Sequence, residues 1–320
     1  MTDTFYIFTK NGRVNSLPSG RSVLALGTFD GVHKAHQIIL REAIELKKEL
    51  CADSVGAWCF SALPANLLFD KKTPQLCSVE EKIERILDIG MDFVAVGDFM
   101  QFAEFSGEDF VEGLLKDKLN CTGVVCGFNH RFGRGGLSSP DTLKKAFGED
   151  HVRVIPEVRM FGETVSSTTI RNYVASGELR KALDMLGQPL TIKARVIGGK
   201  RLGHTIGFPT ANQLFPEDII TPARGIYATL CFTEDGKRHI GVSNVGIRPT
   251  IIDGSDDHVV NCETYICNFN ENIYGKILTV SFCHYIRAEK RFPSVDALRD
   301  QIAKDAEDAV KYFDAIGIKP

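Results

Sequence analysis

The stretch "SVLALGTFDGVHKAH", residues 22–36, joins an apolar run to a glycine-containing turn and then to a segment with helical periodicity. A short continuous apolar run is typical of a strand that is buried on both faces. Gly27 and Gly31 permit a tight turn and a close approach of the backbone. His33 and His36 fall on the first turn of the helix, three residues apart and therefore on one face. This order predicts part of an open α/β sheet, whose ligands bind beyond the carboxyl ends of the strands.

Alternation of strand-like and helix-like segments continues from this stretch to Gly187. Such alternation predicts an α/β fold, in which helices cover a parallel sheet. The expected strands are residues 22–26, 54–60, 92–97, 121–127 and 151–158. The expected helices are residues 36–50, 78–90, 106–119, 139–148 and 166–187, the last of them broken near Ser176 and Gly177.

The pattern changes after Gly187, where short β-type runs are separated by Gly, Pro, Asn and Asp. Close spacing with turn signals predicts a closed or nearly closed β-barrel. The β-type runs are residues 191–197, 225–232, 239–246, 258–269 and 276–286, and a helix is expected over 294–316. We therefore predict two domains, an α/β domain over residues 1–186 and a β-barrel with a terminal helix over residues 187–320.

Length and charge restrict the class of protein. The chain has 320 residues, which fits about two domains, and a net charge of −3. This charge gives no general attraction to nucleic acid or to an anionic membrane, so any polyanion site must be a local pocket. The N-terminal residues do not read as a signal peptide, and no apolar run is long enough to cross a membrane. Nine scattered cysteines without a CxxC pair indicate reduced thiols in the cytoplasm.

The turn after the first apolar run suits an anion. Free backbone N–H groups at a helix start favour phosphate, and imidazole N–H groups of His33 and His36 would add donors. The chain lacks the GxxxxGK[ST] pattern of a P-loop. The alternative is that one histidine caps or packs and the other is exposed to solvent. A metal pair is less favoured, because no third ligand is visible nearby.

A second polar element, "VSSTTIR", covers residues 165–171 and opens the helix after the last expected strand. Its hydroxyl groups and Arg171 could hold a polyphosphate beside the first turn. The alternative is that serine and threonine only cap the helix.

The barrel half carries its own motif, "GKRLGHTIGFPTANQLF", residues 199–215. It is too rich in glycine and turn formers for a plain strand. Thr210 and Asn212 alternate, so in an extended chain their oxygen atoms face one way. Hard oxygen donors suit Mg²⁺ that is shared with substrate phosphates. The alternative is a glycine hairpin with incidental polar residues.

The N-terminal pattern G-x-F-D-G-V-H-x-x-H, followed by S-S-T-x-I-R, resembles the nucleotidyltransferase superfamily that includes bacterial FAD synthetases. "GFNHRFGRGG", residues 127–136, is similar to the segment between those motifs. The resemblance implies a Rossmann-like domain that adenylylates FMN to FAD and releases pyrophosphate. It implies ATP phosphate contacts from His33, His36, Ser166, Thr168 and Arg171, and nucleotide binding by Gly27, Phe29, Asp30 and Gly31. Asn129 would line the ATP or flavin pocket, or else form only a loop turn.

The segments "GFPTAN", "GIYA", "SNVGIRPT", "CETYICNFNENIYGK" and "HYIRAEKRF" resemble riboflavin kinase in order and spacing, over most of residues 188–310. The resemblance implies that Thr210 and Asn212 bind Mg²⁺ and ATP phosphates, with Gly207 in the same binding segment. It implies that Glu263 is the general base for the riboflavin 5′-hydroxyl and that Arg287 meets the flavin. From the residues alone, Glu263 also fits a surface-facing strand position, and Arg287 a solvated charge run.

Both halves together resemble the bifunctional bacterial riboflavin kinase/FMN adenylyltransferase family, with riboflavin, FMN and ATP as the small-molecule substrates. The N-terminal half departs from the family pattern at Ala35, where glycine is common, at Leu63, where histidine is usual, and in "RGGLSS". The kinase half is the cleaner match. Three hypotheses follow: a bifunctional enzyme, a riboflavin kinase whose N-terminal domain adenylylates weakly or only binds nucleotide, and a non-catalytic flavin-sensing module.

Overall fold

The computed structural model describes residues 5–17, 19–69, 72–198, 207–249 and 258–318. The chain divides into two compact units, Met1–Thr169 and Ile170–Pro320. The predicted domain boundary after residue 186 stays a prediction. Within the described ranges, we find no helix with the length and hydropathy needed to span a bilayer.

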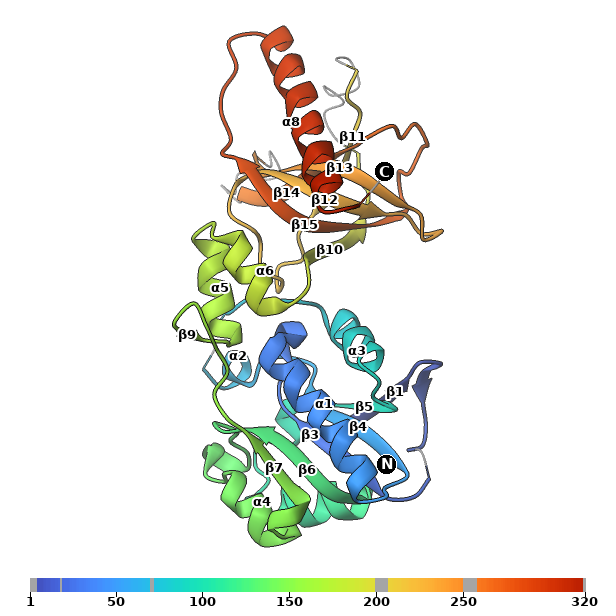
Figure 1. The fold of residues 1–320 in the computed structure, drawn as a ribbon, viewed down its shortest axis with the longest axis vertical. Helices are drawn as coiled ribbons and strands as arrows, with labels where there is room; N and C mark the ends of the chain where they lie inside the picture. The colour runs from blue at the N-terminus through green and yellow to red at the C-terminus, as the bar shows by residue number, and fades with distance from the viewer. Residues whose placement is uncertain (1–4, 18, 70–71, 199–206, 250–257, 319–320) are drawn as a thin grey trace. The chain divides into compact units, whose positions relative to one another are not determined.

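The N-terminal unit contains one mixed sheet (Figure 1), with the strand order β2-β1-β5-β4-β3-β6-β7. Neighbouring strands from β5 to β7 in this order are parallel, as the alternation of segments predicts. A hairpin of β1 and β2, which we did not predict, adds an antiparallel edge beside β5. The strands are β1 (Phe5–Thr9), β2 (Gly12–Val14), β3 (Ser22–Leu26), β4 (Ser54–Phe60), β5 (Phe93–Gly97), β6 (Cys121–Gly127) and β7 (Val152–Ile155).

The sheet reverses its strand order at β3. The chain adds β4 and β5 on one side of β3 and then returns to place β6 and β7 on the other side. Ligands of open α/β sheets bind in the crevice at such a switch point, outside the carboxyl ends of the strands. The turn after β3 and the loop after β6 therefore meet where a ligand is expected.

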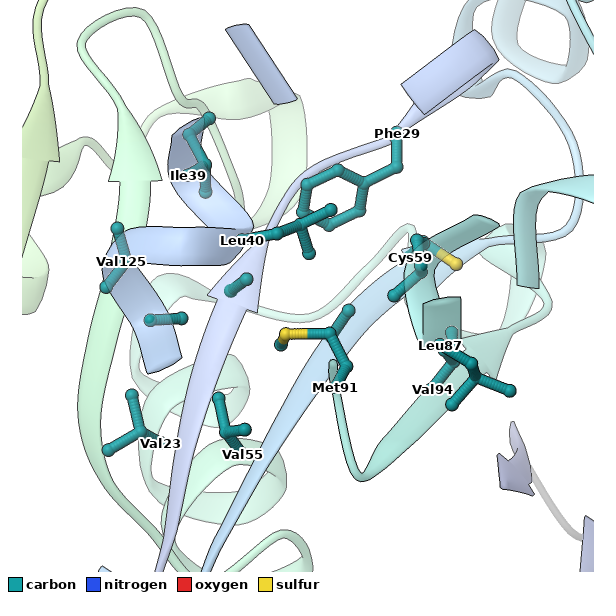
Figure 2. Packing of buried hydrophobic residues seen from close by; sticks show 14 of the residues in the cluster. Val23, Phe29, Ile39, Leu40, Val55, Cys59, Leu87, Met91, Val94 and Val125 are labelled. Atoms are coloured by element: carbon teal, nitrogen blue, oxygen red, sulfur yellow. The ribbon is translucent and has the colours of Figure 1, made fainter. Parts of the chain in front are cut away.

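Alternate residues of β3 enter two separate cores. Val23 and Ala25 pack with helices α1 (Lys34–Glu49) and α3 (Val79–Asp88), and Figure 2 shows part of this cluster. Leu24 and Leu26 pack on the opposite face. That face is covered by the π-helix η3 (Asp109–Lys118) and by α4 (Pro140–Phe147). Because both faces of β3 are buried, polar chemistry is confined to its carboxyl end.

Shorter elements connect these layers. Those of the first unit are η1 (Asp30–Val32), α2 (Pro64–Phe69), η2 (Phe99–Gln101), η4 (Arg134–Gly136), η5 (Glu149–His151), β8 (Arg159–Met160) and β9 (Glu163–Thr164). Helix α5 (Ser167–Ala175) begins at the end of the first unit and continues into the second, where α6 (Leu179–Leu186) follows. The break between them contains Ser176 and Gly177, as predicted.

The second unit contains a six-stranded antiparallel sheet in the order β10-β15-β12-β13-β14-β11. Its edge strands meet, because Ile197 N–H donates to the Asn212 carbonyl at 2.8 Å and Gln213 Nε2 donates to the Ala194 carbonyl at 2.8 Å. The sheet therefore curves into the predicted barrel. The strands are β10 (Leu190–Arg195), β11 (Thr210–Leu214), β12 (Gly225–Phe232), β13 (Arg238–Pro249), β14 (His258–Ile266) and β15 (Ile277–Arg287).

The barrel buries residues on both of its faces. Tyr227 and Phe282 lie in its interior cluster. On the outer face, Ile226 and Val242 pack against Phe313 of the terminal helix α8 (Val295–Ala315). Strand β11 lies within the segment whose glycines argued against a plain strand, and its pairing with β14 supplies the regular structure.

Substitution of Gly56 on β4 tests the packing of the N-terminal sheet. A Cβ there would lie 2.2 Å from the Phe93 ring, which is fully buried. We expect Gly56→Ala to lower the free energy of unfolding by about 1–3 kcal/mol through overpacking. Fluorescence of Trp58, the single tryptophan of the chain, reports this transition because Trp58 lies in the same unit.

The matched control is Gly113→Ala on η3, where a Cβ would project into open space. This change should leave the Trp58 transition in place. An unchanged transition in Gly56→Ala would contradict the packing at Phe93.

Candidate functional site

The turn after β3 has an uncommon backbone. Phe29, Gly31 and Val32 have φ angles of 49°, 76° and 47°. Left-handed conformations are unfavourable for bulky residues and cluster at functional sites, where the surrounding structure holds them. Here the Phe29 side chain is fully buried beside Leu40 in the α1 core (Figure 2). Burial of this ring fixes the turn, and Gly27 is half-buried at its start.

His33 and His36 form one stacked unit at the start of α1. His33 is the N-cap residue, and its Nδ1 accepts from the His36 backbone N–H at 3.4 Å. The two rings are nearly parallel, with centroids 3.6 Å apart, and the Phe29 and His36 rings pack edge to face with centroids 5.2 Å apart. His33 is 4% exposed. The capping role considered in the sequence analysis is therefore present, but neither ring projects freely into solvent.

The environment keeps His36 neutral. Burial lowers the pKa of His36 well below its usual range, and the charges of His33 and Lys82 lower it further. Its Nδ1 is buried without a hydrogen-bond partner among the described residues. Because the His33 Nδ1 accepts a hydrogen bond, the remaining ring nitrogen of His33 carries the proton in the neutral form. The pair thus offers imidazole N–H groups as donors, with His36 in its neutral form.

The start of α5 contacts the same turn. Ser167 Oγ donates to the Asp30 backbone carbonyl at 3.0 Å. Ser166 Oγ accepts from the Thr169 backbone N–H at 3.2 Å, so Ser166 caps the helix. Thr168 is exposed. The sequence patterns singled out Ser166 and Thr168 but not Ser167, which makes the connection. Arg171 lies further along α5, in the second unit, and its phosphate contact stays a prediction.

Asp30 holds the turn to the segment before α3. Its carboxylate is fully buried, and Oδ1 accepts from the Leu76 backbone N–H at 2.8 Å. Arg85 of α3 donates to the Gly31 carbonyl at 3.4 Å. A direct nucleotide contact by Asp30 stays a prediction, whereas its contact with Leu76 stabilises the turn.

Asn129 is exposed in the loop after β6, at the switch point of the sheet. The next residue, His130, stacks on Phe132 with ring centroids 5.7 Å apart. Burial lowers the pKa of His130 to about 4. Its Nε2 has no hydrogen-bond partner among the residues that the structure describes.

In the barrel, Glu263 lies between two asparagines. Asn212 of β11 is directly opposite Glu263 of β14, and Asn244 of β13 is opposite it on the other side. Asn261 Nδ2 donates to Glu263 Oε1 at 3.0 Å. Side-chain alternation puts this row on the same face as Val242, the outer face. Asn244 and Asn261 were not predicted as site residues, although "SNVG" and "NCET" contain them.

Thr210 and Asn212 share this outer face, because they alternate on β11. Asn212 Nδ2 donates to the Thr210 carbonyl at 3.3 Å. Gly207, exposed and with φ of 85°, precedes them, and Phe208 contacts Tyr265 edge-on at 5.0 Å. Within the described ranges no cluster of three or more His, Cys, Asp or Glu side chains could hold a metal. Hydroxyl and amide oxygens fit Mg²⁺ only when substrate phosphates complete its coordination.

A cavity of about 670 Å³ adjoins Thr210. Its wall includes Ala211 and Ile266 of the interior cluster, and Thr264, which lies on the same face of β14 as Ile266. Glu263 lies on the opposite face of β14 from Thr264, since neighbouring residues of a strand alternate. Thr210 is therefore the candidate site residue that borders the cavity.

Arg287 is bound by α8. Its Nη2 lies 2.6 Å from Asp305 Oδ2 and its Nε donates to Oδ1 at 2.9 Å. Asp305 is only 2% exposed, so the pair anchors α8 to β15. A flavin contact by Arg287 stays a prediction.

Comparisons with known proteins identify a family for each half of the chain. A family model described as riboflavin kinase matches residues 186–313, and one described as FAD synthetase matches residues 17–169. Proteins of Listeria monocytogenes and Haemophilus influenzae, both named bifunctional riboflavin kinase/FMN adenylyltransferase, are 34% and 35% identical to this chain. The matches cover 91% of this chain, and 92% and 94% of those proteins. The chain belongs to this family.

A solved structure from Streptococcus pneumoniae, described as a macrolide-efflux protein, has the same fold. It matches with a TM-score of 0.82 and 30% identity, over 92% of this chain and 95% of that one. This likeness supports the two-part fold, in agreement with the two family models. The curated family members named above are transferases.

The buried imidazole of His130 makes stability depend on pH. An unfolded histidine binds a proton below about pH 6.5, whereas His130 in the folded state does so only near pH 4. Between these values the unfolded state holds more protons, so stability falls as the pH falls, by about 3 kcal/mol in all. We expect His130→Phe to flatten this dependence, measured by Trp58 fluorescence in denaturant at pH 7 and 4.5.

His36 acts in the same direction, so the variant should keep part of the slope. Above about pH 7 both proteins should show the same dependence on pH, which serves as the control. An unaltered slope below pH 6.5 would contradict the burial of a neutral His130.

Proposed function

We propose that this chain phosphorylates riboflavin to FMN through residues 187–320 and adenylylates FMN to FAD through residues 1–186. ATP is the co-substrate of both reactions, and Mg²⁺ accompanies it. The observation that carries the second activity is the Ser167–Asp30 hydrogen bond, which joins the two phosphate-type motifs at the switch point of the sheet. Nine free cysteines support a reducing compartment, and we include the cytoplasm in the proposal.

Adenylylation requires that the two substrates are positioned and that the negative charge on the phosphates is stabilised. The FMN phosphate is already ionised, so it attacks the α-phosphate of ATP without a general base, and pyrophosphate leaves. In this proposal the N–H groups of His33 and His36 donate to the phosphate oxygens at the start of α1. Ser166, Thr168 and Arg171 bind from the α5 side.

Apolar side chains at the same edge of the sheet support a flavin ligand. Large exposed apolar residues follow β4, β5 and β6: Leu67, Leu68, Phe69, Met100 and Phe128. Exposed apolar patches commonly mark binding sites. A flat aromatic ring system such as the isoalloxazine would bury them, with Asn129 as a polar neighbour.

Phosphorylation of riboflavin needs a base, because the 5′-hydroxyl acceptor is neutral. Glu263 takes that proton as the oxygen attacks the γ-phosphate of ATP, and ADP leaves. Asn261 holds the Glu263 carboxylate at 3.0 Å, and Asn212 and Asn244 flank it. Bound through Thr210, Asn212 and the phosphates, Mg²⁺ would neutralise phosphate charge.

A kinase-only protein is the second candidate, and two positions favour it. Leu63 precedes α2 where the family pattern has histidine, and Ala35 is half-buried on the first turn of α1. A time course with riboflavin, ATP and Mg²⁺ separates the hypotheses. FMN followed by FAD supports the bifunctional enzyme, FMN alone supports the second candidate, and neither product would contradict both.

His33→Ala should reduce FAD formation by about 10²–10³-fold, because a donor to the phosphates is lost, and should spare FMN formation. Both rates are measured on one preparation. His33 also caps α1, so His33→Asn is the matched variant: asparagine is a good cap but lacks the imidazole. Retention of FAD formation in His33→Asn would contradict the imidazole role.

Glu263→Gln should have the opposite effect. Glutamine has the same shape but accepts no proton, so FMN production should fall by about 10²–10⁴-fold. FMN supplied directly should still become FAD at the wild-type rate. If riboflavin phosphorylation survives the change, Glu263 is not the base.

A further inference from the structure

Lys82 is a fully buried lysine beside the histidine pair. It lies on α3 and is 1% exposed. Its Nζ donates to the Phe60 backbone carbonyl at 3.0 Å, and Phe60 is the last residue of β4. The ammonium group therefore lies at the carboxyl edge of the sheet, where β4 is adjacent to β3.

No carboxylate among the described residues forms an ion pair with Lys82, which distinguishes it from two other cations of the same unit. On the same helix, Arg85 Nη2 lies 3.5 Å from Glu81 Oε1. On α1, Lys47 Nζ lies 2.9 Å from Asp92 Oδ2. Lysine is rarely buried without an anionic partner, because removing its charge from water is costly.

The charge of Lys82 acts on residues at the turn after β3. Electrostatic influence of Lys82 extends to His36, where it disfavours the protonated imidazole, and to the buried Cys59. Helix α3 packs against η1, and Arg85, one turn after Lys82, donates to the Gly31 carbonyl. Lys82 is thus beneath the turn that receives phosphate in the proposed function.

We propose that Lys82 supplies the buried positive charge of the nucleotide site, and that the anion which compensates it is the polyphosphate of ATP or the pyrophosphate product. The proposal rests on the adenylyltransferase function of the N-terminal unit. Imidazole N–H groups and a helix start bring hydrogen bonds and a partial charge of about one half, which leaves most of the charge of a triphosphate to cationic side chains. A buried ammonium acts through a low dielectric and is weakly screened by salt. Lys82 is a positioning residue, since it acts from beneath the site.

Replacing a lysine that has only a structural role and replacing one that supplies charge to a ligand site should have opposite effects on the stability of the fold. Removal of a structural lysine weakens the fold. Removal of a buried charge that has no ion pair leaves the fold as stable or makes it more stable, since functional sites commonly hold groups that cost stability. The proposal therefore predicts that a neutral substitution lowers activity without lowering stability.

The test compares Lys82→Met and Lys82→Arg with the wild-type chain. In Lys82→Met, we expect kcat/KM for FAD formation to fall on the order of tenfold or more, with FMN formation by the same molecules unchanged. The Trp58 unfolding midpoint should stay or rise. In the wild type, inorganic pyrophosphate should raise that midpoint, and in Lys82→Met this shift should be lost. Lys82→Arg keeps the charge and should retain the shift.

The matched control is Lys116→Met. Lys116 also donates to a backbone carbonyl, that of Ala146 at 3.1 Å, but it is paired with Glu112 and lies on η3. This variant should keep both FAD formation and the pyrophosphate shift.

Three results would overturn the proposal: equal pyrophosphate shifts in the wild type and Lys82→Met, a wild-type chain that pyrophosphate does not stabilise, or a Lys82→Met chain that unfolds earlier. Absence of FAD formation in the wild type would contradict the proposed function instead, and the pyrophosphate shift tests the charge independently of that activity.

Discussion

Burial of β3 on both faces is the constraint from which the N-terminal site follows. Val23 and Ala25 enter one core and Leu24 and Leu26 the other, so the strand has no face for polar groups. Polar chemistry collects where β3 ends, and the buried Phe29 ring fixes the chain there in left-handed conformations. Helix α1 consequently begins at a turn whose backbone is held in place by the core.

In the barrel, strand register has the corresponding role. Because residues alternate across a strand, one register sends Thr264 inwards and Glu263 outwards, with an asparagine directly opposite on each neighbouring strand. A slip of one residue would bury the carboxylate in the barrel interior. The bridge between Ile197 and Asn212 joins the edge strands and so helps to hold this register.

The sequence predicts the fold class, the parallel strands and the barrel, because each depends on local periodicity. The β1–β2 hairpin was not predicted. Its Asn11-Gly12 turn is a local hairpin signal, but the pairing of β1 with β5 depends on tertiary packing, which local sequence does not specify. Ser167, Asn244 and Asn261 were missed for a related reason. Their contacts join segments that are far apart in the sequence, or depend on strand register. A single serine or asparagine in a sequence does not indicate which residue it will contact.

Only one of the two reactions needs a general base, and the residues at the two sites differ accordingly. In the turn after β3, the carboxylate of Asp30 is buried and accepts from the backbone of Leu76, while burial keeps His36 neutral. That arrangement suits an acceptor that is already an anion. In the barrel, Glu263 is half-buried and held by the Asn261 amide, so its carboxylate stays oriented while partly hydrated. A neutral hydroxyl acceptor needs such a group. Chemistry at one site therefore prepares the substrate of the other: phosphorylation creates the anion that the second site can use without a base.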